Sequence, residues 1–164
     1  MVKFIYLFNI FIFNTTTTLT YKMIKIYAIG KVKQQFIKEG INEFLKRLTK
    51  YAKVEYIETQ SLSQDKLKGF TIGLDERGEQ LTSVKFSNLI KEKTLNYKQI
   101  NFIIGDAFSL PKNIKYDYKL SLSKLTMPTN IARLVFIEQL YRAFTIIKNE
   151  PYHKDWIKVS IWLR

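Results

Sequence analysis

The feature that most constrains the fold is the alternation, from Met23 onward, of short apolar runs with longer segments of helical period. Strands are predicted at residues 24–29, 54–58, 70–75, 100–104 and 118–123, and helices at 34–51, from Ser83 and from Thr129 or Asn130. This alternation favours an α/β fold with a mostly parallel sheet and helices on both faces. Ligands bind such folds outside the carboxyl ends of the strands, so we expect a site in the loops after the third, fourth and fifth strands.

Two of the predicted helices have apolar faces that the spacing identifies. In the helix at 34–51 the apolar residues recur at Phe36, Ile37, Ile41, Phe44, Leu45 and Leu48. In the last helix the predicted buried face consists of Ile131, Leu134, Val135, Leu140, Tyr141, Phe144 and Ile147. Both helices are therefore expected to pack on the sheet.

The chain is interpreted as one domain, residues 23–154, between two atypical ends. Residues 1–22 contain an apolar stretch at 4–13, which is shorter than the about 20 residues of a transmembrane helix and is followed by no signal-peptide cleavage site. In one interpretation translation starts at Met23; in another, residues 4–13 attach the chain to a membrane. We favour Met23 as the true start and expect no membrane partner. Residues 155–164 are interpreted as a C-terminal extension.

The charge balance favours a polyanionic partner. The chain has 27 Lys and Arg against 14 Asp and Glu, for a net charge of +13, and cationic side chains that neutralise phosphates release condensed counterions. There is no cysteine and one histidine, His153. This composition excludes disulfides, thiolate metal sites, a cysteine nucleophile and a histidine-rich metal centre, so we expect no metal.

Three loops that follow predicted strands are candidates for a pocket. They comprise residues 73–78, 104–108 and 122–128 and are rich in small residues, which let the backbone approach a ligand. Backbone amides and carbonyls can read an adenine without charged side chains. Each loop is also compatible with an ordinary turn.

The last helix carries two arginines with different expected roles. Arg133 and Arg142 are nine residues apart and point to roughly opposite sides of the helix. One can serve an RNA phosphate and the other a second surface or a subunit contact. Alternatively, Arg142 forms an ion pair with Glu138 one turn earlier on the helix surface and has no functional role.

Several sequence blocks resemble the RlmH family. They are IYAIGK at 26–31, LDERG at 74–78, LSKLTMP at 122–128, ARLVFIEQLYRA at 132–143 and PYHK at 151–154. The resemblance, which covers residues 23–154, implies a SPOUT-class methyltransferase with a deep trefoil knot near the C-terminus. It also implies S-adenosylmethionine as cofactor and N3 of a pseudouridine in large-subunit (23S) ribosomal RNA as target. We therefore expect a cytoplasmic homodimer that acts on the large subunit or the 70S ribosome.

The resemblance also assigns site residues. The cofactor contacts it implies are Leu74, Gly105, Leu122, Ser123, Lys124, Leu125, Thr126 and Met127. Arg142, Tyr152 and His153 are expected to face the nucleotide, where His153 is either the base that removes the N3 proton or a phosphate contact beside an Arg142 that stabilises the anionic base. The residues expected to contact RNA phosphates are Lys31, Lys33, Arg133 and Lys154.

The sequence departs from the family pattern in five places. Asp106 follows Gly105 where the family has a second glycine, Ser109 replaces a later glycine, and Thr129 replaces a histidine. The connection at 59–69 is too short for the helix that the family places there, and residues 155–164 extend past the usual end. Two alternatives to the leading hypothesis follow from these departures. The first is an RNA- or ribosome-binding module that has lost the cofactor, and the second is a SPOUT enzyme with another RNA substrate, such as a transfer RNA.

Overall fold

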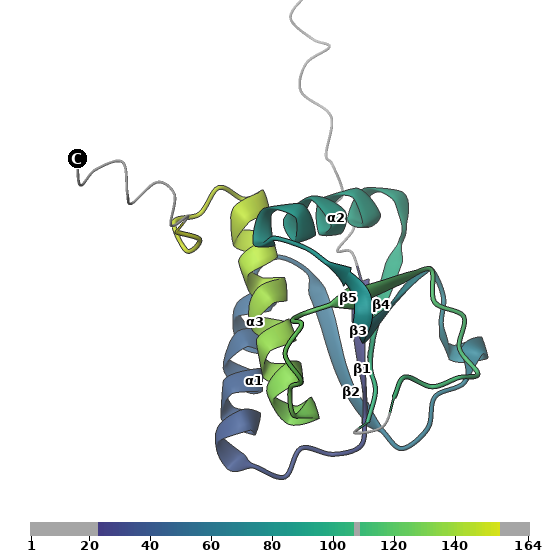
Figure 1. Ribbon diagram of the computed structural model, residues 1–164. Helices are drawn as coiled ribbons and strands as arrows, with labels where there is room; N and C mark the ends of the chain where they lie inside the picture. The colour runs from purple at the N-terminus through teal and green to yellow at the C-terminus, as the bar shows by residue number, and fades with distance from the viewer. Residues whose placement is uncertain (1–22, 107–108, 155–164) are drawn as a thin grey trace, which may run out of the picture.

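The computed structural model describes residues 23–106 and 109–154, and their strands form one parallel sheet (Figure 1). The elements in chain order are β1 (Met23–Ile29), α1 (Gln35–Leu48), β2 (Lys53–Thr59), a 3-10 turn (Gln64–Lys66), β3 (Phe70–Gln80), α2 (Ser83–Asn96), β4 (Gln99–Ile104), β5 (Tyr118–Ser121) and α3 (Thr129–Ile147). The strand order in the sheet is β2-β1-β4-β3-β5. The prediction of an α/β fold with a parallel sheet is confirmed, and the trefoil knot stays a prediction.

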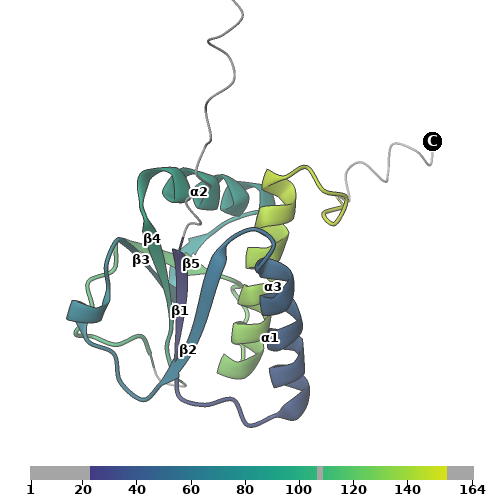
Figure 2. The same cartoon turned by 180° about the vertical axis from the view of Figure 1, so that it is seen from behind.

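The main core lies between one face of the sheet and all three helices. Alternate strand residues such as Ile26, Ile72 and Phe102 point to this face and are fully buried. Helix α3 packs between α1 and α2, as the two opposite views in Figures 1 and 2 show. The rings of Phe136 on α3 and Phe102 on β4 lie 4.8 Å apart, centroid to centroid, at the centre of this core.

The other face of the sheet is covered by connecting segments and not by helices. Tyr27 and Ile103 on this face pack under Leu62, Leu67 and Ile114. The prediction of helices on both faces is therefore wrong for the described residues. The physical reason is the short connection between β2 and β3, which crosses β1 and β4 with room for only one 3-10 turn.

Strand β3 is longer than predicted, and its pairing explains why. It pairs with β5 from Ile72 to Leu74, and pairing resumes at Glu79 opposite Leu120, with an irregularity between Leu74 and Glu79. The residues of this bulge leave the ladder at the carboxyl end of the sheet. Although the connection before it is short, β3 runs parallel to β4, as expected.

The buried face of α3 differs in part from the predicted one. Leu140 and Phe144 are buried as expected, but Phe136, Ile137 and Ala143 are also buried. A helix between two others is covered on more than one side, which a single apolar stripe does not reveal.

The predicted extensions, residues 1–22 and 155–164, lie outside the described residues. Among the helices described here, none is both long and apolar enough to cross a membrane.

Candidate active site

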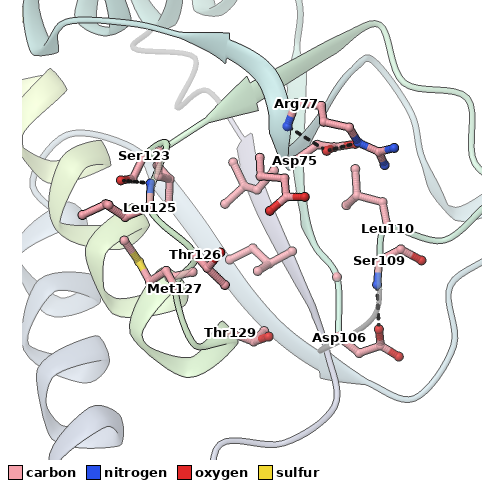
Figure 3. A pocket seen from close by; sticks show the side chains of 16 residues that line it. Asp75, Arg77, Asp106, Ser109, Leu110, Ser123, Leu125, Thr126, Met127 and Thr129 are labelled. Carbon is pink, nitrogen blue, oxygen red and sulfur yellow. Dashed lines mark hydrogen bonds and ion pairs between the residues drawn. The ribbon is translucent and has the colours of Figure 1, made fainter.

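A cavity of about 300 Å³ opens at the carboxyl ends of β3, β4 and β5, against the first turn of α3. Its walls are the three loops that the sequence singled out, and Figure 3 shows the loop at 122–128 facing the loop after β4 across it. The lining residues are Leu74, Asp75, Glu76, Arg77, Ile104, Gly105, Asp106, Ser109, Leu110, Leu122, Ser123, Leu125, Thr126, Met127, Thr129 and Ala132.

Most of the residues predicted to contact the cofactor gather around this cavity. Leu74, Gly105, Leu122, Ser123, Leu125, Thr126 and Met127 line it, whereas the exposed Lys124 does not. Adjacent strand ends bring these residues together although they are far apart in the chain. Their contact with a cofactor stays a prediction.

The bulge within β3 is held by an ion-pair cluster centred on Asp75. The Asp75 carboxylate accepts hydrogen bonds from the Arg77 backbone N–H and from the Lys119 ammonium, both at 3.0 Å. Burial opposes ionisation of this carboxyl, but the hydrogen bonds from Arg77 and Lys119 keep its pKa below the ordinary value. Asp75 therefore stays charged at neutral pH. Its bonds to Arg77 and Lys119 hold the part of the cavity wall that the bulge in β3 forms.

The loop after β4 turns back tightly over Gly105. A Cβ atom at this position would collide with the carbonyl group of Ser109, so only glycine fits. The Asp106 carboxylate accepts a hydrogen bond from the Ser109 N–H at 3.2 Å. The aspartate that departs from the family pattern thus supports the turn from inside the loop.

The loop between β5 and α3 is shaped by two serines. The Ser121 hydroxyl donates to the Ser123 carbonyl oxygen at 3.0 Å, and the Ser123 hydroxyl accepts from the Leu125 N–H at 3.0 Å. These bonds end β5 at Ser121, earlier than predicted, and direct the loop along the cavity.

Several residues that line the cavity are not among the predicted cofactor contacts. Leu110 reaches the cavity because the loop folds back over Gly105, and Ala132 does so because the first turn of α3 abuts the strand ends. Leu110 lies in none of the sequence blocks that resemble the family, and Ala132 begins such a block without being assigned to the cofactor. Among residues 23–106 and 109–154, no three histidine or acidic side chains gather where they could hold a metal ion.

Two of the three predicted catalytic residues, Arg142 and Tyr152, form a separate cluster around Glu138. One Glu138 carboxylate oxygen accepts from Arg142 Nη2 at 2.6 Å and from the Tyr152 hydroxyl at 2.9 Å. The Arg142 guanidinium lies 4.8 Å from the centre of the Tyr152 ring. The half-buried His153 follows, and its Nδ1 and Arg142 Nε are buried without a hydrogen-bond partner in this structure. The expected pairing of Glu138 with Arg142 is therefore present.

The cavity contacts the first turn of α3, whereas Glu138 and Arg142 lie in its later turns. Arg142 follows Ala132 by ten residues, which corresponds to about 15 Å of helix. Within one chain, Arg142, Tyr152 and His153 therefore do not line the cavity.

Comparisons with known proteins decide the family. A family model described as "Predicted SPOUT methyltransferase" matches residues 23–153. A protein of Carboxydothermus hydrogenoformans named ribosomal RNA large subunit methyltransferase H is 37% identical over 157 residues, covering 80% of this chain and 99% of the relative. Proteins of the same name from Streptococcus agalactiae and Clostridium botulinum are each 36% identical with the same coverage. The chain belongs to the RlmH family of SPOUT methyltransferases.

Membership of the RlmH family confirms the prediction of an RlmH-like methyltransferase. The alignment has 157 positions and covers 99% of the relative. The 80% of this chain that it covers contains fewer than 157 residues. The RlmH-like part of this chain is thus shorter than the relative, in agreement with the short connection between β2 and β3.

The predicted RNA contacts of this RlmH-family chain divide into exposed and buried residues. Lys31, Lys33 and Lys154 are exposed. Arg133 is only 2% exposed; its Nη2 donates to the Ile29 carbonyl oxygen, and its Nη1 lies 3.8 Å from the Glu58 carboxylate. This position does not support a phosphate contact and corrects the prediction for Arg133. The nine-residue spacing set the two arginines apart but did not show which one is buried.

Arg133 is expected to be a stability residue in this RlmH-family fold. Replacing it with alanine leaves the Ile29 carbonyl and the Glu58 carboxylate without a cationic partner. We expect Arg133→Ala to lower the free energy of unfolding by about 2–3 kcal/mol, measured by urea denaturation. The control Lys33→Ala, at an exposed site, is expected to change it by less than about 0.5 kcal/mol. If Arg133→Ala is as stable as the wild type but binds RNA more weakly, Arg133 contacts a phosphate and is not a stability residue.

Proposed function

We propose that this protein uses S-adenosylmethionine to methylate N3 of a pseudouridine in large-subunit ribosomal RNA. The observation that carries the proposal is the cavity at the carboxyl ends of β3, β4 and β5, which gathers seven of the eight residues that the resemblance assigns to the cofactor. The relatives named ribosomal RNA large subunit methyltransferase H support the substrate class. An enzyme that acts on the large subunit or the 70S ribosome works in the cytoplasm, where we place it.

The residues around the cavity fit S-adenosylmethionine. Leu74, Leu110 and Leu122 provide apolar surface for an adenine, and the loop backbones next to them can pair with its polar edge. The bound cofactor would supply an electrophilic methyl group on a sulfonium. The remaining task of the protein is to align this group with a nitrogen of the RNA and to remove a proton.

The Glu138 cluster has the groups that such a transfer needs. Burial and the hydrogen bond to Glu138 raise the pKa of the Tyr152 phenol, so Tyr152 stays protonated at neutral pH and acts as a donor. His153 has an Nδ1 without a hydrogen-bond partner in this structure, and an imidazole nitrogen can act as a general base. The Arg142 guanidinium, fixed by Glu138, would stabilise the anionic base.

A homodimer joins the two halves of the site. In one chain the cavity and the Glu138 cluster lie at opposite ends of α3. A two-fold arrangement that runs the α3 helices of two chains in opposite directions would bring the cluster of each chain to the cavity of the other. We therefore propose a composite active site with Arg142, Tyr152 and His153 contributed across the interface.

The direct test is methyl transfer to large ribosomal subunits from cells that lack this gene. Incubation with the protein and S-adenosylmethionine is expected to yield N3-methylpseudouridine, detected by nucleoside mass spectrometry. Arg142→Ala is expected to abolish transfer because the anionic base loses its cation. The matched control is Arg47→Ala, which removes an arginine paired with Glu43 at 2.7 Å in the same one-turn geometry, and it should keep activity. Subunits that stay unmodified with wild-type protein would refute the proposed activity.

The composite site is tested by mixing two inactive variants. Thr126→Trp fills the cavity from an exposed loop position, and Arg142→Ala removes the cation. Half of the randomly paired dimers are mixed, and each has one intact cavity facing one intact Arg142, so about one quarter of wild-type activity should return. A mixture as inactive as the separate variants would show that both groups act within one chain.

A further inference from the structure

A second cavity, of about 430 Å³, lies directly beside the first. Asp106 and Thr129 line both cavities, so the two cavities share this rim. The walls of the second cavity come from the loop after β1, the first turn of α1 and the first turn of α3. In Figures 1 and 2, α1 and α3 both begin at this end of the sheet. We call this second cavity the Phe36 groove, after the aromatic side chain that lines it.

Phe36 is an aromatic side chain without a role in the core. It lies in the first turn of α1 and is 64% exposed, whereas its neighbour Ile37 and the next-turn residue Ile41 are buried. Among the described large apolar residues, it is the one aromatic side chain that is more than half exposed. The fold therefore gains little from Phe36, and its ring is available to a ligand in the groove.

The rim of the Phe36 groove is polar and mainly cationic. Asn130 Nδ2 at the start of α3 donates to Gln34 Oε1 before α1 at 2.7 Å, which ties the two helix starts together. Lys31 lines the groove and is exposed, and the exposed Lys33 follows it in the chain. Asp106 is the one acidic residue among those that line the groove.

We propose that the Phe36 groove binds an unpaired nucleobase of the RNA substrate, stacked on the Phe36 ring, with its backbone phosphate near Lys31 and Lys33. Aromatic side chains flanked by cations are how proteins hold single-stranded RNA, because every base has a face that can stack. The Gln34 and Asn130 amides lie where they can pair with the base edge. The inference rests on the proposed function and adds a contact to a nucleotide that flanks the methylated one.

The stacking contact is tested by fluorescence anisotropy with a short, fluorescein-labelled, single-stranded RNA of mixed sequence. We expect Phe36→Ala to weaken binding about ten-fold or more, since stacking on an aromatic ring is lost. Phe36→Leu should weaken it similarly because leucine is apolar but has no aromatic face, and Phe36→Trp should retain or improve it. The matched control Leu95→Ala removes a side chain that is 71% exposed near the end of α2 and should bind as the wild type does.

Two outcomes would overturn the proposal. One is wild-type affinity in Phe36→Ala, and the other is full rescue by Phe36→Leu, which would show that only apolar bulk matters. If the first outcome is accompanied by loss of the dimer, the ring belongs to a protein interface. Thermal melting should be unaltered in every variant.

Methyl transfer to large ribosomal subunits provides a second readout. Phe36→Ala should raise KM for the subunits and leave kcat and the affinity for S-adenosylhomocysteine unchanged, because the groove lies outside the cofactor cavity. A lowered kcat at unchanged KM would contradict a binding role. If the wild type transfers no methyl group, the proposed function is refuted. The anisotropy measurement still tests whether the Phe36 groove binds RNA.

Discussion

The rest of the structure depends on the packing of α3 across a single face of the sheet. Phe136, Ile137 and Leu140 are fully buried in the middle of this helix, and burial of such side chains is worth about 1.5–3 kcal/mol each. Because α3 is anchored at its centre, its first turn closes the cavity while its later turns hold Arg142 at the other end. The helix thus fixes the distance between the cavity and the Glu138 cluster within one chain, which is why the proposed composite site includes a second chain.

Charge is used in two different ways in this molecule. Asp75, Glu138 and Arg133 are held by partners within the protein. They shape the bulge in β3, the Glu138 cluster and the end of β1. Lys31 is exposed at the Phe36 groove, and the exposed Lys33 is two residues further along the chain, where both can contact phosphates. The excess of positive charge in the sequence therefore indicates the class of partner, but the structure decides which cations can meet it.

Much of the fold was predictable from the sequence because the signals are local. Apolar period located the helices and strands within a few residues, and the carboxyl-end rule located the cavity loops around Gly105 and Ser123. Properties that depend on tertiary packing were not predictable. Arg133 looked like a surface cation, and periodicity placed Phe36 with the core residues of α1 although it faces outward. The alternation of strands and helices did not show that all three helices pack on one face of the sheet.

Binding of S-adenosylhomocysteine, measured by isothermal titration calorimetry, tests the central claim that the cavity holds the methyl donor. We expect saturable binding with one site per chain, and its loss in Thr126→Trp, because a bulky ring at that position fills the cavity from an exposed loop. The absence of binding heat over a range of temperatures with the wild-type protein, or unchanged affinity in Thr126→Trp, would contradict the account. The first result would favour an RNA-binding module that has lost the cofactor.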